Sequence, residues 1–210
     1  MTADAAFWDQ IAEKYAKDPI KDPLSYEQTL ERTRSYLTSR SSVLEVGCGT
    51  GSTALSLAAS AHRIVACDIS EAMIGIARRK LREPGAPQNV CFDVARISDD
   101  HLPVETFDVV TAFNVLHLVR DLDEALAAIV ERVRPGGLFI SKTACLSDSS
   151  LLLLKPVLGL LSVTGRLPHV LFLSRKRLLA RMRAHGFQII ESGNFPRRPP
   201  RHFVVARRLD

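Results

Sequence analysis

The sequence predicts a single α/β domain built on a doubly wound seven-stranded sheet, mostly parallel, with an antiparallel hairpin at one edge and helices on both faces. Between residues 42 and 143, short apolar runs alternate with helical patterns, which indicates parallel strands joined by right-handed crossovers. Two further strand-like runs near the C-terminal end are separated by nine residues without a helical pattern. These two runs are therefore expected to pair antiparallel.

The composition is that of one globular domain. Of the 210 residues, 46% are apolar and 24% are charged, which excludes the disordered, collagen-like and disulfide-scaffold classes. The four cysteines lie far apart and form no CxxC pair, so we expect reduced, mostly buried thiols in a cytoplasmic protein and no zinc site. The opening MTADAAFWDQ lacks the basic and apolar regions of a signal peptide, so none is expected.

An N-terminal helical cap is predicted over residues 1–40. Its first helix carries an apolar stripe at i, i+3, i+4 and i+7, formed by Trp8, Ile11, Ala12 and Tyr15. A second helix is predicted from a similar stripe formed by Tyr26, Leu30, Thr33 and Leu37. Pro19 and Pro23 lie between the two stripes and separate the helices.

The core of the domain is predicted over residues 41–145. The expected strands span residues 42–46, 63–67, 89–93, 107–113 and 138–143, and the expected helices span 52–61, 70–81 and 122–133. Ser70 is a suitable N-cap for the second of these helices, and Asp121 or Asp123 starts the third. The run FDVVTAF is apolar enough to predict a strand that is buried on both faces.

The rest of the chain divides into an apolar insertion, residues 146–173, and a last helix with a hairpin, residues 174–210. The most apolar stretch, 151–173, contains charged residues and prolines and falls short of a membrane span. The last helix is expected to run from about Ser174 to His185 and to end at Gly186 in the left-handed cap position. The hairpin strands are expected over residues 187–192 and 202–207.

A glycine-rich turn gives the strongest chemical signal. In residues 43–51, VLEVGCGTG, a strand runs directly into glycines and then into a helix. Ligands of doubly wound sheets bind outside the carboxyl ends of the strands, where glycines let them approach the backbone. Ser52 replaces the third glycine of the dinucleotide fingerprint, so the turn predicts a nucleotide-type ligand other than NAD. A purely structural glycine turn is the alternative interpretation.

Two aspartates at strand ends strengthen this prediction. Asp68 follows the second strand, 17 residues after Gly51, where its carboxylate can accept hydrogen bonds from both ribose hydroxyls of an adenosine group. Its alternative role is a helix cap, although Ser70 is better placed for that. Asp93 ends the third strand, where a carboxylate can accept a hydrogen bond from the amine of adenine. The alternative for Asp93 is a solvated loop acid.

These residues carry a family resemblance. VLEVGCGTG, ACDIS followed by Met73, CFDVA, FDVVTAFNVLHLVRD and RPGG before an apolar strand occur in order over about residues 7–145. As a set they resemble the class I S-adenosylmethionine-dependent methyltransferases, particularly the small-molecule branch that includes the ubiquinone/menaquinone C-methyltransferases. The resemblance implies a Rossmann-like fold, residues 41–145 as the cofactor-binding core and S-adenosylmethionine as the cofactor. It also implies that the helix of FWDQIAEKYAK folds over the cofactor.

Contacts to the sugar and the amino-acid end of the cofactor follow from this resemblance. It implies that Gly47, Gly49 and Gly51 line the methionine and ribose portions. Asp68 would bind the ribose hydroxyls. Tyr15 would close over the site from the N-terminal helix, and a tyrosine of the core is the alternative.

Contacts to the adenine follow in the same way. The resemblance implies that Ile69 and Met73 flank the base and that Asp93 and Val94 lie at its edge. Asn114, just after the fourth strand, would contact the cofactor through its backbone.

His117 is the candidate catalytic residue. Methyl transfer from a sulfonium mainly requires that the nucleophile is held in line with the methyl–sulfur bond. Oxygen and carbon-acid nucleophiles also need a base, and the neutral imidazole of His117, in the loop after the fourth strand, can accept the proton. The alternative is a histidine that only shapes the acceptor pocket. Magnesium-assisted transfer is disfavoured because no acidic cluster surrounds the fourth strand.

The apolar insertion and the basic C-terminal segment bear on the partner. The net charge is +5, yet from Arg166 onward eleven Lys and Arg residues stand against two acids. The insertion can line a pocket for a lipophilic acceptor, rest on a membrane surface beside the basic tail, or pack on the sheet or in a homodimer interface.

Three classes of function remain at this point. The first is methyl transfer to a small, lipophilic or aromatic acceptor molecule. The second is a nucleic-acid methyltransferase, which the basic segment suggests, although that segment lacks interleaved aromatic residues and Asn114 to His117 replace the NPPY-type motif. The third is a non-catalytic module that binds S-adenosylmethionine. The intact turn and both aspartates favour the first class.

Overall fold

The computed structural model describes residues 3–99, 106–148, 168–195 and 201–210. Its centre is a seven-stranded sheet in the order β3-β2-β1-β4-β5-β7-β6. The strands are β1 (Ser42–Val46), β2 (Arg63–Asp68), β3 (Val90–Val94), β4 (Phe107–Phe113), β5 (Val133–Ala144), β6 (Phe187–Asn194) and β7 (Arg201–Arg208). β1 to β5 are parallel, and β7 is antiparallel to both β5 and β6. The predicted doubly wound, mostly parallel sheet with an antiparallel hairpin at one edge is confirmed.

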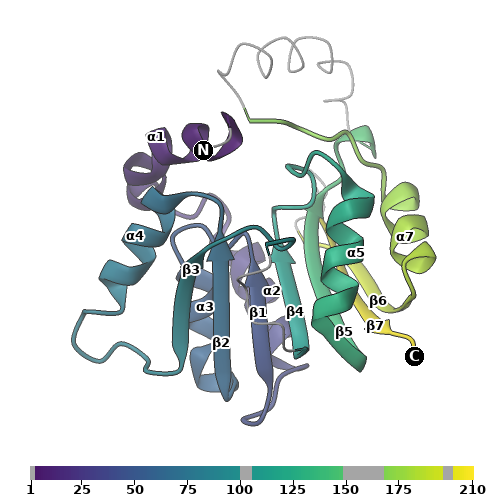
Figure 1. Cartoon of the computed structure of the whole chain (residues 1–210), viewed down its shortest axis with the longest axis horizontal. Helices are drawn as coiled ribbons and strands as arrows, with labels where there is room; N and C mark the ends of the chain where they lie inside the picture. Colours follow the sequence, from purple (N-terminus) through teal and green to yellow (C-terminus); the bar gives the residue numbers. More distant parts are fainter. Residues whose placement is uncertain (1–2, 100–105, 149–167, 196–200) are drawn as a thin grey trace.

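Helices cover both faces of the sheet (Figure 1). The helices are α1 (Ala3–Lys17), α2 (Pro23–Arg34), α3 (Ser52–Leu57), α4 (Glu71–Lys80), α5 (Leu122–Arg132) and α7 (Arg175–Ala184), with short 3-10 turns η1 (Ala58–Ser60) and η2 (Leu146–Asp148). Side chains of α2, α3 and α4 pack on one face, and those of α5 and α7 pack on the other. None of the described helices has the length and hydropathy needed to cross a bilayer.

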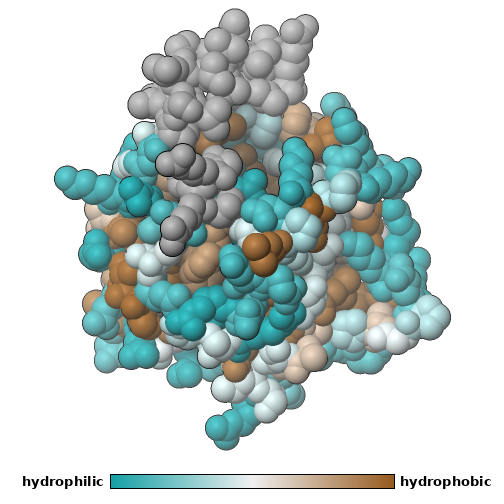
Figure 2. All heavy atoms as spheres, turned by 180° about the vertical axis from the view of Figure 1, so that it is seen from behind, coloured by the Kyte–Doolittle hydropathy of each residue, from teal (hydrophilic) through white to brown (hydrophobic). Residues whose placement is uncertain are grey.

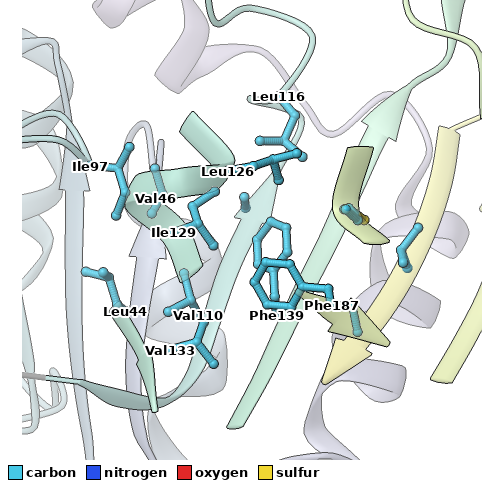
Figure 3. Close-up of a cluster of buried hydrophobic side chains, with 14 of the residues drawn as sticks. Leu44, Val46, Ile97, Val110, Leu116, Leu126, Ile129, Val133, Phe139 and Phe187 are labelled. Carbon is cyan, nitrogen blue, oxygen red and sulfur yellow. The ribbon is translucent and has the colours of Figure 1, made fainter. Parts of the chain in front are cut away.

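The larger part of the core lies between the sheet and the pair α5 and α7. Figure 3 shows Leu44, Val110 and Phe139 of the sheet facing Leu126 and Ile129 of α5. The ring of Phe139 packs on that of Phe187 with a centroid distance of 5.5 Å. Each such buried side chain contributes about 1.5–3 kcal/mol relative to an exposed one. This packing fixes the strand ends that surround the site.

Helix starts agree with the sequence signals. The Ser70 hydroxyl accepts a hydrogen bond from the Met73 amide at 3.1 Å, which caps α4 as predicted. The Asp121 carboxylate accepts from the amides of Asp123 and Glu124, so Asp121, rather than Asp123, caps α5. Gly186 follows α7 with φ +82°, the left-handed conformation expected there.

Two element boundaries differ from the prediction by four residues or more, and the others by fewer. The helix expected over residues 52–61 ends at Leu57 and continues as η1. The fifth strand begins at Val133 rather than Leu138, because Val133 already pairs with Phe107. The register shifts before Leu138 pairs with Val109, and Gly136, at φ +71°, lies within this irregular stretch.

The side of the molecule opposite to the view of Figure 1 is largely polar. Figure 2 shows hydrophilic side chains over much of it, with hydrophobic residues singly or in small groups among them. Three of the four cysteines are buried as expected, and Cys91 is exposed. The interpretations given to residues 151–173 fall largely on residues 149–167, outside the described part of the chain.

Candidate functional site

A large cavity opens at the carboxyl ends of the parallel strands. Its volume is about 1290 Å³, above the roughly 300–1,000 Å³ that is usual for one small ligand. Its lining residues come from α1, from the turn after β1 and from the ends of β2, β4, β5 and β7; they include Tyr15, Gly49, Asp68, Asn114, Lys142 and Arg201. The cavity therefore has space for two small molecules at the position where open α/β sheets bind ligands.

Two glycines of the turn after β1 line this cavity. Gly47 has φ +68°, and a side chain there would place Cβ 2.6 Å from Val115 Cγ2. Gly49 has φ +54°, and its nearest neighbour would be Tyr15 Cε1 at 4.0 Å, so its backbone faces open space. The turn thus presents bare backbone to a ligand, which is what the spacing predicts.

Gly51 has a different role from the one implied by the resemblance. It does not belong to the cavity lining. A Cβ there would lie 2.5 Å from Phe92 Cζ and 2.9 Å from Ala77 Cβ, at φ +76°. Gly51 is therefore required for the packing of β3 and α4 against the turn, and the expectation that it lines the site is corrected.

Asp68 is held at the end of β2 by backbone donors. Its Oδ2 accepts a hydrogen bond from the Gly49 amide at 2.9 Å, and its Oδ1 accepts one from the Ser70 amide at 3.0 Å. Burial raises the pKa of this carboxyl above its usual value, and the two amides partly offset that effect. A carboxylate has about four lone-pair positions, so this carboxylate can still accept from a ligand in the cavity.

Asn114 lies directly after β4 in the left-handed region, with φ +58°. Its amide donates a hydrogen bond to the Lys142 carbonyl oxygen at 2.6 Å. Among the described residues it is the only non-glycine with positive φ, and such conformations concentrate at functional sites. Asn114 lines the cavity, as do the predicted residues Ile69 and Met73.

Comparisons with known proteins agree with this geometry. Residues 44–139 match the family described as Methyltransferase domain. The methyltransferase nsrG of Aspergillus novofumigatus is 32% identical over 141 residues, which are 65% of this chain and 50% of that protein. A ubiquinone biosynthesis O-methyltransferase of Aromatoleum aromaticum is 37% identical over 98 residues, which are 45% of this chain and 40% of that protein. The chain thus spans half or less of these relatives' length.

The fold is shared over almost the whole chain. The solved structure of the DhpI–SAH complex superimposes with a TM-score of 0.76, covering 99% of this chain and 96% of that one at 23% identity. Residues 44–139 of this chain therefore form a methyltransferase domain. The predicted family and Rossmann-like fold are confirmed.

Glu45 is a residue of this methyltransferase domain to which the sequence analysis gave no role. Its side chain lies in the cavity lining and is 3% exposed, and Oε2 has no hydrogen-bond partner among the described residues. Burial raises the pKa of Glu45 to about 8, with a hydrogen bond from the Ala54 backbone opposing the rise. The sequence signal that could have identified Glu45 is an acidic residue between Leu44 and Val46 in an otherwise apolar strand.

Asp93 and Val94 lie outside the main cavity of the methyltransferase domain. The Asp93 carboxylate accepts from its neighbour's amide, Val94 N, at 2.9 Å and lies 3.6 Å from the Arg78 guanidinium. Val94 lines a smaller pocket of about 330 Å³ together with Ile69. Neither residue lines the main cavity, where Ala95 and Arg96 form the adjoining edge, and contact of Asp93 and Val94 with the adenine stays a prediction.

His117 does not belong to the cavity lining of the domain. The Leu171 amide donates to the His117 carbonyl oxygen at 2.7 Å, so the segment before α7 covers this residue. Burial, with a smaller effect of Arg201, lowers the pKa of His117 to about 4, and Nδ1 has no partner among the described residues. The imidazole is therefore neutral at pH 7, as expected. Its role as a base stays a prediction.

Tyr15 lies on α1 at the mouth of the cavity. The residue is 52% exposed, and its ring packs edge-on against that of Trp8, with 6.4 Å between centroids. The helix is anchored by Asp9, whose Oδ1 accepts from the Ser70 hydroxyl at 2.6 Å and from the Ala72 amide at 3.0 Å. Sequence reasoning missed Asp9, since its partners lie far away in the chain. A tyrosine so exposed is not part of the core.

No group of three or more His, Cys, Asp and Glu side chains within the described ranges has the arrangement of a metal site.

Proposed function

We propose that this protein transfers the methyl group of S-adenosylmethionine to a small acceptor with a lipophilic or aromatic body. The observation that carries the proposal is Asp68, whose carboxylate is oriented by two amides and faces the cavity beside bare glycine backbone. Hydroxyl pairs of a ribose are the donors that such a carboxylate suits. The family of the domain and the space for two molecules support the same conclusion.

The chain's own residues fit the cofactor at both ends. The Asp68 carboxylate would accept from the ribose hydroxyls, and Ile69 and Met73 would flank the base. The unpartnered, buried Oε2 of Glu45 suits an ammonium group, which is what the amino-acid end of S-adenosylmethionine carries. A buried acid that gains such a partner ionises, and this offsets the cost of its burial.

When bound, S-adenosylmethionine would supply a methyl group on a cationic sulfur atom. The acceptor's lone pair would form the new bond to the methyl carbon, and the sulfur would keep the electron pair of the broken methyl–sulfur bond. The protein's part is mainly to position the two molecules. Phe113 and Val119 supply apolar lining on the β4 side of the cavity. These residues would hold an apolar acceptor body and exclude water.

Calorimetric titration with SAH tests the assignment. Asp68→Ala is expected to weaken binding by about 1.5–3 kcal/mol, the range for a hydrogen bond to a charged group. Asp93→Ala is the matched control, because Asp93 also ends a strand but lies outside the cavity. SAH affinity that is unchanged in Asp68→Ala, or a larger loss in Asp93→Ala, would contradict the proposal. Thermal unfolding of both variants checks that each is folded.

A further inference from the structure

Lys142 is a buried cation near the end of β5. Its side chain lies in the cavity lining and the residue is 4% exposed. Nζ donates to Thr29 Oγ1 at 2.8 Å and lies 3.3 Å from both the carbonyl oxygen and the hydroxyl of Ser25. All these acceptors are neutral. Within the described residues no carboxylate lies within ion-pair distance of Nζ.

Asp22 is the acid whose charge acts on Lys142, but its carboxylate already accepts a hydrogen bond within α2. Asp22 is the N-cap of α2, and its Oδ1 accepts a hydrogen bond from the Ser25 amide at 3.0 Å. The charge of Asp22 stabilises the protonated amine of Lys142, but burial destabilises that amine by more. The pKa of Lys142 therefore falls to about 8. At pH 7 the amine is still mostly protonated, so a charge is buried without a paired anion.

Arg201 brings a second cation to the same part of the cavity. It is the first residue of β7 and pairs with Ala144, two residues beyond Lys142 on β5. Its guanidinium lies close enough to lower the pKa values of both Lys142 and His117. No ion pair of Arg201 occurs with any residue that the structure describes, although its side chain lines the cavity.

Two unpaired cations in the same part of a cavity are unfavourable without a ligand. Burial of one charge without a counter-charge costs several kcal/mol, and the second cation adds repulsion. An anionic group between them removes both penalties and forms charge-assisted hydrogen bonds. The arrangement is therefore incomplete in the empty protein and complementary to an acidic ligand.

The position of these cations relative to β4 distinguishes acceptor from cofactor. Asp68 and Glu45 belong to β2 and β1, whereas Lys142 and Arg201 belong to β5 and β7, on the opposite side of β4 in the sheet order. We propose that Lys142 and Arg201 form an anion subsite for the methyl acceptor. The acceptor is then an apolar molecule with a carboxylate or phosphate group. This inference rests on the proposed function.

Binding of small aromatic anions to the SAH-saturated full-length protein tests the subsite. The probes are benzoate and phenyl phosphate, with benzamide as the neutral analogue of benzoate, and Trp8, the single tryptophan, reports from the cavity lining. We expect at least one of the anions to bind at least tenfold more tightly than benzamide at pH 7. Lys142→Met and Arg201→Gln should each abolish this preference, and Lys142→Arg should retain it.

The control is Arg207→Gln, which removes an exposed arginine from the far end of the same strand and should leave the preference intact. Anion affinity measured as a function of pH shows whether the charge of Lys142, rather than the shape of its side chain, is responsible for binding. In the wild type, anion affinity should fall as the pH rises above about 8, where Lys142 loses its proton, whereas Lys142→Arg should keep its affinity there. A merely structural lysine would not produce this difference.

Three results would overturn the inference. The first is equal affinity of the wild type for the anions and for benzamide. The second is a preference for anions over benzamide that is unchanged in both Lys142→Met and Arg201→Gln. The third is a tenfold loss of SAH affinity in Lys142→Met, because it would assign the lysine to the carboxylate of the cofactor. Arg201 is exposed, so its variant is informative even if Lys142→Met fails to fold. Failure of the wild type to bind SAH would instead contradict the proposed function.

Discussion

The two sides of the cavity differ in charge and in how the chain builds them. The β1–β2 side contributes two acids, the buried Glu45 and the half-buried Asp68, and the β5–β7 side contributes two cations, Lys142 and Arg201. The acidic side comes from one short stretch of sequence around the glycine turn. The basic side needs the antiparallel pairing of β7 with β5. The difference indicates one subsite for a cationic, ribose-containing cofactor and another for an anionic acceptor.

The largest expected effect concerns Glu45 on the acidic side. Below pH 4.5 this carboxyl is protonated in both the folded and unfolded protein. Between 4.5 and about 8 only the unfolded chain ionises, so the unfolding free energy of the wild type should fall by about 1.4 kcal/mol per pH unit relative to Glu45→Gln.

Urea unfolding of the two proteins at several pH values measures this difference without ligand. A difference that does not change between pH 5 and 8 would mean that Glu45 is already ionised in the folded protein without ligand, which would contradict the view that the ammonium group of the cofactor ionises it.

Gly51 tests whether the turn acts through packing as well as ligand contact. Gly51→Ala should lower the unfolding free energy by about 2–4 kcal/mol, because Cβ would meet Phe92 and the residue has positive φ. Gly85→Ala, at φ +82° in open space, is the control and should cost about 1 kcal/mol. Equal losses in the two variants would show that contact with Phe92 is unimportant.

Lys142 should have the opposite effect on stability from a structural residue. In the empty protein at pH 7, Lys142→Met should raise the unfolding free energy by about 1–3 kcal/mol, since it removes a buried unpaired charge. The gain should shrink as the pH rises from 8 toward 10.5, because the folded wild type loses its proton first. A destabilised variant would show that the bonds to Ser25 and Thr29 outweigh the burial cost.

The smallest expected effect is that of His117→Ala. A base is most effective when its pKa lies near the working pH, and the pKa of His117 is about 4. Cofactor affinity should stay within twofold, and turnover should fall by less than about tenfold. Steady-state kinetics with an acceptor measures this, and a loss of a hundredfold or more would establish His117 as the base.

Sequence patterns predicted the elements whose signals are local. The Ser70 cap, the turn at Gly47 and Gly49 and the strand-end position of Asp68 each depend on neighbouring residues alone. The surroundings of Gly51 and Asp93 could not be predicted, because they come from other elements. Phe92 of β3 fills the space next to Gly51, and Arg78 of α4 lies beside Asp93.

The basic side of the cavity could not be predicted in this way. Lys142 and Arg201 meet only through the register of β5 and β7, in which Ala144 pairs with Arg201. That register depends on hydrophobic packing across the whole sheet. Glu45 could have been predicted as a site residue from the sequence, because an acid inside an otherwise apolar strand requires a partner or a raised pKa.

A crystal structure with SAH bound tests the central claim most directly. The account predicts both ribose hydroxyls within hydrogen-bond distance of the Asp68 carboxylate and the ammonium group on the Glu45 side of the cavity. The space beside Lys142 and Arg201 should stay open to a second molecule. A ribose held by Asp93, or a carboxylate of SAH bound to Lys142, would contradict it.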